Sequence, residues 1–229
     1  SKTSQNLKEL GVTKGDRVAG FLPNFAGSIV AMLATVSIGA IWSSCSPDFG
    51  EQGVIDRFGQ IEPKVLFCVD GYFYNGKSHI CLSKIKSFTA RLPTLKQVVI
   101  FDYASSDNNS INNSISYQEI LDNYEPNEID FERVGFDHPL YIMYSSGTTG
   151  VPKCIVHGHG GTLVQHLKEH QLQTNISAGD RVFYFTTCGW MMWNWLVGSL
   201  SLGATILLFD GFPMYKKMTY YFNIEVKKK

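Results

Sequence analysis

The stretch Tyr144-Ser-Ser-Gly-Thr-Thr-Gly-Val-Pro-Lys153, continuing as Cys154-Ile-Val-His-Gly-His-Gly-Gly161, is the part around which the chain is organised. Apolar runs at 140–144 and 154–156 predict strands on both sides of a loop. The glycines can adopt positive φ and turn successive N–H groups to one side, where they suit an anion. The hydroxyls add donors, and the lysine adds a mobile positive charge. We therefore predict a polyphosphate loop comprising Ser145, Ser146, Gly147, Thr148, Thr149, Gly150 and Lys153.

Two other interpretations of this loop compete with that one. A Walker loop needs Gly, four residues and then Gly-Lys-Ser/Thr, whereas Lys153 follows Pro152 and precedes Cys154. A plain surface turn is often rich in Ser, Thr and Gly. A run from Ser145 to Lys153 that is closed by Pro and Lys is much less common, so the sequence favours a nucleotide loop.

Short apolar runs alternate with helical patterns along the rest of the chain. Strands are predicted at 16–22, 40–43, 64–69, 97–101, 140–144, 154–156, 180–186 and 204–209. Helices are predicted at 2–10, 28–38, 51–60, 78–92, 117–124, 161–172 and 193–202. This alternation implies parallel strand pairing, and hence an α/β fold whose sheet is covered by helices on both faces.

Three local features sharpen that expectation. Asn24 is a candidate cap for the helix at 28–38, which is apolar nearly all round and therefore predicted to be buried. Residues 104–116 are rich in Ser and Asn, which predicts a mobile surface insertion. The helix at 161–172 starts soon after the loop, so its dipole could help to hold negative charge there.

Four histidines follow the loop in two pairs. His157 and His159 have no neighbouring cluster of Cys or carboxylate residues, which disfavours a metal site. His166 and His170 are one helical turn apart, but Glu169 does not stand where a His-Glu-x-x-His site needs it. We predict packed, hydrogen-bonded side chains or a place near a ligand, and no metal ligands.

Composition narrows the class of protein. The 229 residues are 44% hydrophobic and 17% charged, which is typical of a globular protein with a sizeable core. The formal net charge is zero, so neither a nucleic-acid partner nor a membrane partner is indicated. The five cysteines are widely spaced and odd in number, which predicts buried, reduced thiols in a cytoplasmic protein. The oligomeric state is left open.

The loop sequence Ser-Ser-Gly-Thr-Thr-Gly-Val-Pro-Lys at 145–153 resembles that of the AMP-forming acyl-CoA synthetases, the adenylate-forming superfamily. The segments at 40–50, 166–170 and 189–195 are similar to the branch that joins acetoacetate to CoA. The resemblance implies part of the large N-terminal domain of that fold, without its C-terminal lid. It further implies that residues 1–211 belong to a domain truncated at both ends. Residues 212–229 depart from the family and form a lysine-rich tail, which we predict to lie outside the fold.

The resemblance also implies a chemistry and a set of site residues. The substrates would be ATP with Mg²⁺, a short acid and CoA, and the products would be acyl-CoA, AMP and pyrophosphate. Trp190, Met191 and Met192 would line the acyl pocket, and Lys77 would meet the CoA phosphates. Lys77 follows an Asn-Gly pair, as the family's adenylation lysine does. That catalytic lysine, however, lies near the C-terminus of the full-length proteins and outside this chain.

Three interpretations of the chain's activity remain. The first is part of an acetoacetate ligase that is inactive alone, because the ribose segment, the hinge and the lid are missing. The second is the corresponding part of an acetate or propionate ligase. The third is a non-catalytic truncated product that at most binds nucleotide or a partner.

Overall fold

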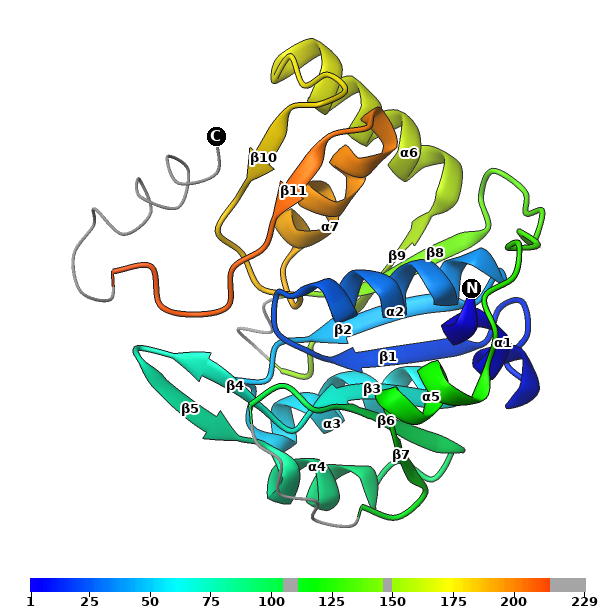
Figure 1. Ribbon diagram of the computed structural model, residues 1–229, viewed down its shortest axis with the longest axis vertical. Coiled ribbons are helices and arrows are strands. Elements are labelled where there is room, and N and C mark those ends of the chain that lie inside the picture. The colour runs from blue at the N-terminus through cyan, green and yellow to red at the C-terminus, as the bar shows by residue number, and fades with distance from the viewer. Residues whose placement is uncertain (105–110, 146–149, 215–229) are drawn as a thin grey trace.

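The computed structural model describes residues 1–104, 111–145 and 150–214, and its main feature is a seven-stranded sheet (Figure 1). The strand order is β7-β6-β3-β1-β2-β8-β9. All neighbours are parallel except β8 and β9, which run antiparallel. The strands are β1 (Arg17–Phe21), β2 (Ile41–Cys45), β3 (Val65–Val69), β6 (Gln97–Phe101), β7 (Ser114–Ser116), β8 (Pro139–Tyr144) and β9 (Cys154–Gly158).

Helices cover both faces of this sheet, as the alternating pattern predicted. The first face carries α1 (Lys2–Glu9), α2 (Ala26–Ser37) and α5 (Tyr117–Asn123). The second face carries α3 (Glu51–Ile61) and α4 (Leu82–Thr89). The side chains of β3 alternate between the two cores: Phe67 points to the first, and Leu66 and Cys68 to the second.

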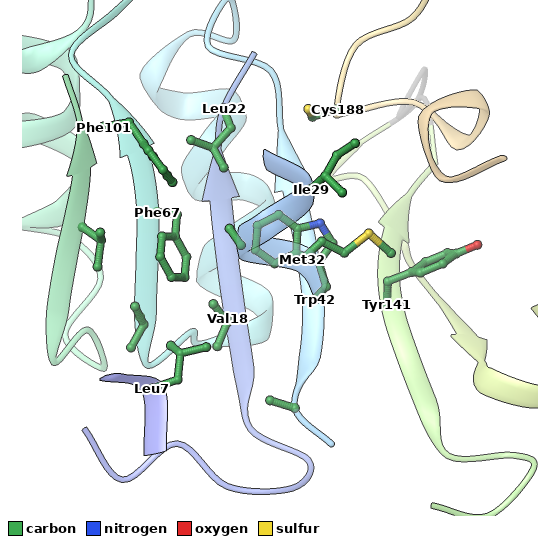
Figure 2. Close-up of a cluster of buried hydrophobic side chains, with 14 of the residues drawn as sticks. Leu7, Val18, Leu22, Ile29, Met32, Trp42, Phe67, Phe101, Tyr141 and Cys188 are labelled. Atoms are coloured by element: carbon green, nitrogen blue, oxygen red, sulfur yellow. The ribbon is translucent and has the colours of Figure 1, made fainter. Parts of the chain in front are cut away.

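Trp42 lies in the middle of the first core, between the sheet and α2 (Figure 2). Its ring crosses β1 so closely that a Cβ added at Gly20 would lie 2.6 Å from it. The glycine on β1 is therefore needed for this ring to pack flat on the sheet. Because Trp42 is only 1% exposed, truncating it would leave a large cavity.

A second group of elements lies beyond β8 and β9 (Figure 1). It contains α6 (His159–Lys168), which continues as a π-helix (Glu169–Gln173), and α7 (Met191–Gly198), which continues as a 3₁₀ helix (Ser199–Leu202). β10 (Arg181–Phe183) and β11 (Thr205–Leu207) form a separate parallel pair. Trp193 of α7 joins the first core, which ties this group to the main sheet.

The predicted helix at 78–92 is wrong in its first part. β4 (Gly71–Tyr74) and β5 (Lys77–Ile80) form an antiparallel hairpin there, and α4 begins only at Leu82. Asn75 and Gly76 form the turn with φ of 49° and 73°. Asn-Gly is the favoured pair for a two-residue hairpin turn, so the sequence did carry the signal.

Two smaller expectations are also wrong, and a third is wrong in its last part. Phe25, not Asn24, is the N-cap of α2, and the Asn24 side chain instead accepts a hydrogen bond from Trp193 Nε1 at 3.0 Å. α2 is not buried all round, since Val30 and Leu33 are 41% and 47% exposed. The supposed surface insertion ends in β7, and Ile111 before it is buried; residues 105–110 lie outside the described part.

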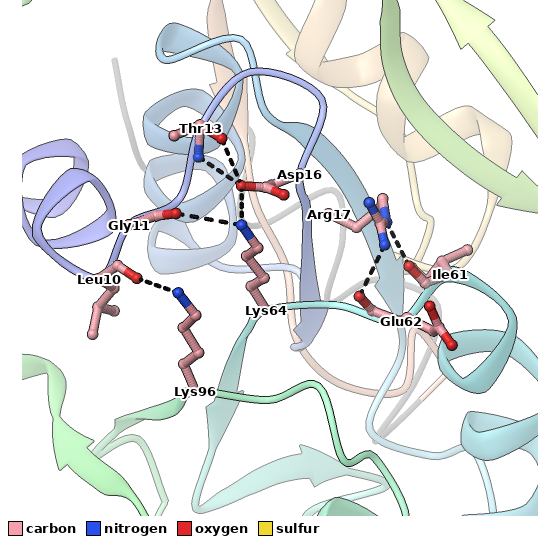
Figure 3. Close-up of polar contacts among 9 residues, drawn as sticks. All are labelled: Leu10, Gly11, Thr13, Asp16, Arg17, Ile61, Glu62, Lys64 and Lys96. Atoms are coloured by element: carbon pink, nitrogen blue, oxygen red, sulfur yellow. Dashed lines mark hydrogen bonds and ion pairs between the residues drawn. The ribbon is translucent and has the colours of Figure 1, made fainter.

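Polar contacts fasten the amino ends of the strands (Figure 3). Lys64, just before β3, forms an ion pair of 2.5 Å with Asp16, just before β1. Arg17 donates from Nε to the Ile61 carbonyl at 2.6 Å and from Nη2 to the Glu62 carbonyl at 3.3 Å. Arg17 thereby satisfies carbonyl groups at the C-terminal end of α3. None of the helices in the described parts has the length and apolar character needed to cross a lipid bilayer.

Candidate nucleotide-binding edge of the sheet

The polyphosphate loop predicted from the sequence begins at the carboxyl edge of the sheet. β1, β2, β3 and β8 are parallel, so the segments that follow them leave from one edge. In open α/β sheets, ligands bind outside the carboxyl ends of the strands. The loop after β8, the segment after β2 and the hairpin after β3 are therefore all placed where a ligand is expected.

The neck of the loop is closed by Ser145 and Lys153. The Ser145 N–H donates to the Lys153 carbonyl at 3.0 Å, and the Lys153 N–H donates to the Ser145 hydroxyl at 3.0 Å. Gly150 has a φ of 152°, a backbone conformation that favours glycine. Four predicted members of the loop lie outside the described residues: Ser146, Gly147, Thr148 and Thr149.

The hydroxyl of Tyr144, the residue directly before the loop, is hydrogen-bonded to the neighbouring strand. A hydrogen bond of 3.0 Å joins its hydroxyl to that of Ser43 on β2, and Ser43 also donates to the Ile142 carbonyl at 2.9 Å. Burial raises the pKa of Tyr144, so its phenol stays neutral. The phenol next to the loop is therefore neutral and hydrogen-bonded, and the exposed Lys153 carries a positive charge at the other end of the loop.

The predicted acyl-pocket residues lie at the same edge. The carbonyl of Cys188, near the start of their segment, accepts a hydrogen bond from the Ser44 hydroxyl at 2.7 Å, which holds the segment against the end of β2. α7 begins at Met191, two residues earlier than predicted, so Trp190 is its N-cap and the two methionines form its first turn. Trp190 and Met191 are 65% and 50% exposed, whereas Met192 is partly buried.

Trp193 and Trp195 were predicted to be core residues. Trp193 is fully buried, and Trp195 is partly buried beside the small β10–β11 sheet. Lys77, the predicted CoA contact, is the first residue of β5 and is exposed at the tip of the β4–β5 hairpin. That hairpin follows β3 and projects from the edge of the sheet that also carries the loop (Figure 1).

The expectation that the dipole of α6 helps to hold negative charge at the loop is wrong. β9 begins at Cys154, opposite Tyr144 at the loop, and ends at Gly158, opposite Pro139 at the far edge. α6 starts there, at His159, so its N-terminus lies at the other end of the strand pair. Its first N–H groups are used by the chain itself: those of His159 and Gly160 donate at 2.9 Å to the His138 and Phe136 carbonyls.

Five of the six histidines lie around α6 and the far ends of β8 and β9. The ring of His157 lies 5.0 Å from that of Tyr141, and the ring of His159 lies 5.6 Å from that of His138. The two remaining predicted histidines, His166 and His170, have ring centroids 5.9 Å apart. His170 is fully buried and bonded through Nε2 to the Trp195 carbonyl at 2.9 Å, as expected for a packed side chain.

The cysteines are free thiols, and four of the five are buried as expected. Cys154 is the exception: it is exposed where the chain leaves the loop. Partial burial of its sulfur still raises its pKa, so the group stays a neutral thiol at pH 7. Within residues 1–104, 111–145 and 150–214, no group of three or more His, Cys, Asp or Glu side chains is arranged to hold a metal ion.

Comparison with known proteins identifies the class. The family model of AMP-binding enzymes matches residues 1–226, and the chain therefore belongs to the AMP-binding enzyme family. The fold and the loop at the carboxyl edge agree with this assignment.

Within that family the chain is similar to acetoacetyl-CoA synthetases. It is 52% identical to the acetoacetyl-coenzyme A synthetase of Rhizobium meliloti over 218 residues, which are 93% of this chain and 33% of that protein. It is 53% identical to the Gallus gallus acetoacetyl-CoA synthetase over 91% of this chain and 32% of that protein. The solved acetoacetyl-CoA synthetase from Streptomyces lividans superimposes with a TM-score of 0.92 at 43% identity, covering 97% of this chain and 34% of that one. The chain thus spans about a third of the length of the relatives it matches.

Proposed function

We propose that this chain carries the polyphosphate loop and part of the acyl pocket of a ligase that joins acetoacetate to CoA. In the first step a carboxylate oxygen of the acid attacks the α-phosphorus of ATP, which forms acetoacetyl-AMP and releases pyrophosphate. In the second step the CoA thiolate attacks the acyl carbon and releases AMP. The 52% identity to an acetoacetyl-CoA synthetase supports the substrate, and the loop at the carboxyl edge supports the chemistry.

The residues present suit the phosphate end of ATP. Hydroxyl and N–H groups around Ser145 can donate to phosphate oxygens, and the exposed Lys153 ammonium can neutralise charge. Among the described residues, the Lys153 ammonium makes no ion pair, which leaves it available to a ligand. Mg²⁺ prefers phosphate oxygens and water, so it would enter bound to ATP. Phosphoryl transfer of this type depends on positioning and charge neutralisation, and those are the tasks of this loop.

The acid and CoA would bind beside the loop. Met191 and Met192 form the first turn of α7, where flexible apolar side chains suit a short acid. Lys77 would contact a phosphate of CoA, because it is the exposed cation on the neighbouring hairpin. The second candidate, a ligase for acetate or propionate, would use the same loop and differ only at the acyl pocket.

The test uses full-length protein that contains this chain, together with the chain alone. The full-length protein should release AMP with ATP, Mg²⁺, CoA and acetoacetate, and turn over acetate and propionate at least about tenfold more slowly. The chain alone should release no AMP above a control without protein. Equal turnover of all three acids would remove the assignment of acetoacetate, and AMP release by the chain alone would contradict its predicted inactivity.

A further inference from the structure

The peptide group between Pro152 and Lys153 is held from both sides. Its carbonyl accepts a hydrogen bond of 2.8 Å from Nε2 of Gln60, and its N–H donates to the Ser145 hydroxyl at 3.0 Å. Pro152 is buried, and its ring restricts φ. This peptide plane is fixed at its carbonyl and at its N–H, and the φ of Pro152 is restricted. Together these constraints set the direction in which the Lys153 side chain leaves the backbone.

Gln60 reaches the loop from α3, 92 residues earlier in the chain. Both ends of its amide are used: Nε2 donates to Pro152 and to the Asp56 carbonyl at 2.5 Å, and Oε1 faces the Cys154 thiol at 3.7 Å. Because the thiol donates to the oxygen, the amide nitrogen is directed to the Pro152 carbonyl. The orientation of this side chain is therefore set by its own contacts.

α3 is itself firmly placed. Val54 and Phe58 are fully buried in the second core, and the carbonyls of its C-terminal end are bound by Arg17 of β1 (Figure 3). One turn before Gln60, the guanidinium of Arg57 lies 4.5 Å from the ring centre of Phe49 and 5.7 Å from that of Tyr144. The same helix thus contacts the residue before the loop and the residue near its end.

We propose that Gln60 is a positioning residue for Lys153: it fixes the Pro152–Lys153 peptide and so directs the ammonium group toward the phosphates bound by the loop. This inference rests on the proposed function. The Lys153 side chain already has four rotatable bonds before its charge, and an unfixed peptide would add backbone motion to the spread of ammonium positions. Gln60 reduces that spread without touching the ligand.

The test measures binding of tripolyphosphate to the full chain by calorimetry. Gln60→Met keeps the length of the side chain and removes the donor, and should weaken binding about fivefold. Gln52→Met is the matched control, because Gln52 lies two turns earlier on α3 and its contacts are with Asp56 and Arg91. Binding by this variant should equal that of the wild type.

A double-mutant cycle separates positioning from a general effect on the loop. If Gln60 acts through Lys153, adding Gln60→Met to Lys153→Ala should weaken binding no further. A fivefold loss in both backgrounds, or no loss in either, would overturn the proposal. A wild-type chain that binds no tripolyphosphate would overturn the proposed function, and with it the direction toward phosphates.

Amide hydrogen exchange without ligand tests the positioning by itself. In Gln60→Met the Lys153 N–H should exchange about fivefold faster, whereas in Gln52→Met it should not change. Unchanged exchange in Gln60→Met would show that Gln60 does not fix the peptide, whatever the binding measurements give. Hydrogen exchange therefore tests the positioning role of Gln60, and tripolyphosphate binding by the wild type tests the proposed function, so failure of one is distinguished from failure of the other.

Discussion

At one end of the β8–β9 pair, Ser145 and Lys153 close a loop rich in hydroxyl and glycine residues; at the other end, the same strands lead into a cluster of histidines around α6. At the loop end, the side chain of Lys153 is exposed. The histidine end packs imidazole rings on Tyr141, on Trp195 and on one another. Two strands thus connect a region suited to binding with a region suited to packing, and substitutions at the two ends should have different consequences.

Removing the charge at the loop end should give the largest effect. Lys153→Ala should weaken binding of tripolyphosphate by the chain about ten- to a hundredfold, because a charge-assisted hydrogen bond is lost. Its urea unfolding midpoint should stay within error, since the side chain is exposed. Calorimetry and urea titration check the two parts. Unaltered binding would mean that the loop is only a turn.

Crowding the histidine end should affect stability instead. A Cβ at Gly198 would lie 2.4 Å from Nδ1 of His166, so Gly198→Ala should destabilise the fold by about 1–2 kcal/mol, net of the better helix propensity of alanine. Gly161→Ala on α6 is the matched control, because nothing lies within 4 Å of its Cβ position. Tripolyphosphate affinity should be unchanged in both variants. A loss of affinity in Gly198→Ala would show that the two ends are coupled.

Lowering the pH should also reduce stability through the histidine end of the β8–β9 pair. Burial, helped by the charges of His170 and His157, lowers the pKa of His166 to about 4. The unfolded chain therefore binds more protons between about pH 4 and 6.5, and the free energy of unfolding rises with pH through that window and levels off above it. His166→Gln should remove about 1 kcal/mol of this pH dependence, a value reduced for solvent screening.

Urea unfolding at pH 4.5 and 7.0 measures that difference. His79→Gln is the control, because His79 lies on the β4–β5 hairpin away from the cluster. A pH dependence that is the same in the wild type and in His166→Gln would show that carboxylates, such as the ion-paired Asp16, account for all of it.

The smallest effect should come from Lys77, which projects from the edge that carries the loop. Lys77→Ala should lower the affinity of the chain for CoA about two- to fivefold, as expected for one exposed charge. Tripolyphosphate binding should not change. Fluorescence competition with a CoA analogue gives the first value, and calorimetry the second. If tripolyphosphate binding weakened as well, the anion site would extend along the edge as far as the hairpin.

The sequence predicted much of the sheet, because buried parallel strands such as Val65–Val69 are continuous apolar runs between clear helix patterns. It failed where pairing is decided at long range or by a turn. Ser114–Ser116 has no apolar pattern and becomes a strand only by pairing with β6. The β4–β5 hairpin depends on Asn75 and Gly76, a turn signal that the helical pattern of the residues after it outweighed.

The candidate site could be predicted only where it is continuous in sequence. The loop and the Trp190 segment were found because their residues are adjacent, and their binding roles stay predictions. Gln60 could not be found in this way, because nothing near it in sequence indicates a contact with Pro152. The expected dipole of α6 was misplaced for a related reason: the length of β9 moves the helix start to the opposite edge. Of the predicted tail at 212–229, residues 212–214 are described and residues 215–229 lie outside the described part, and the place of the tail outside the fold stays a prediction.

The pairing of β2 with β8 has a consequence for the order of folding. Ser43 and Ile142, joined by a hydrogen bond in this pair, are 99 residues apart, whereas β1, β2 and β3 follow one another closely in the chain. Contacts between distant residues form slowly, because a long loop of chain must be closed before they contribute. The loop edge is therefore expected to assemble after β1, β2 and β3 have paired. On a ribosome, the proposed nucleotide site would remain incomplete until the second half of this chain has emerged.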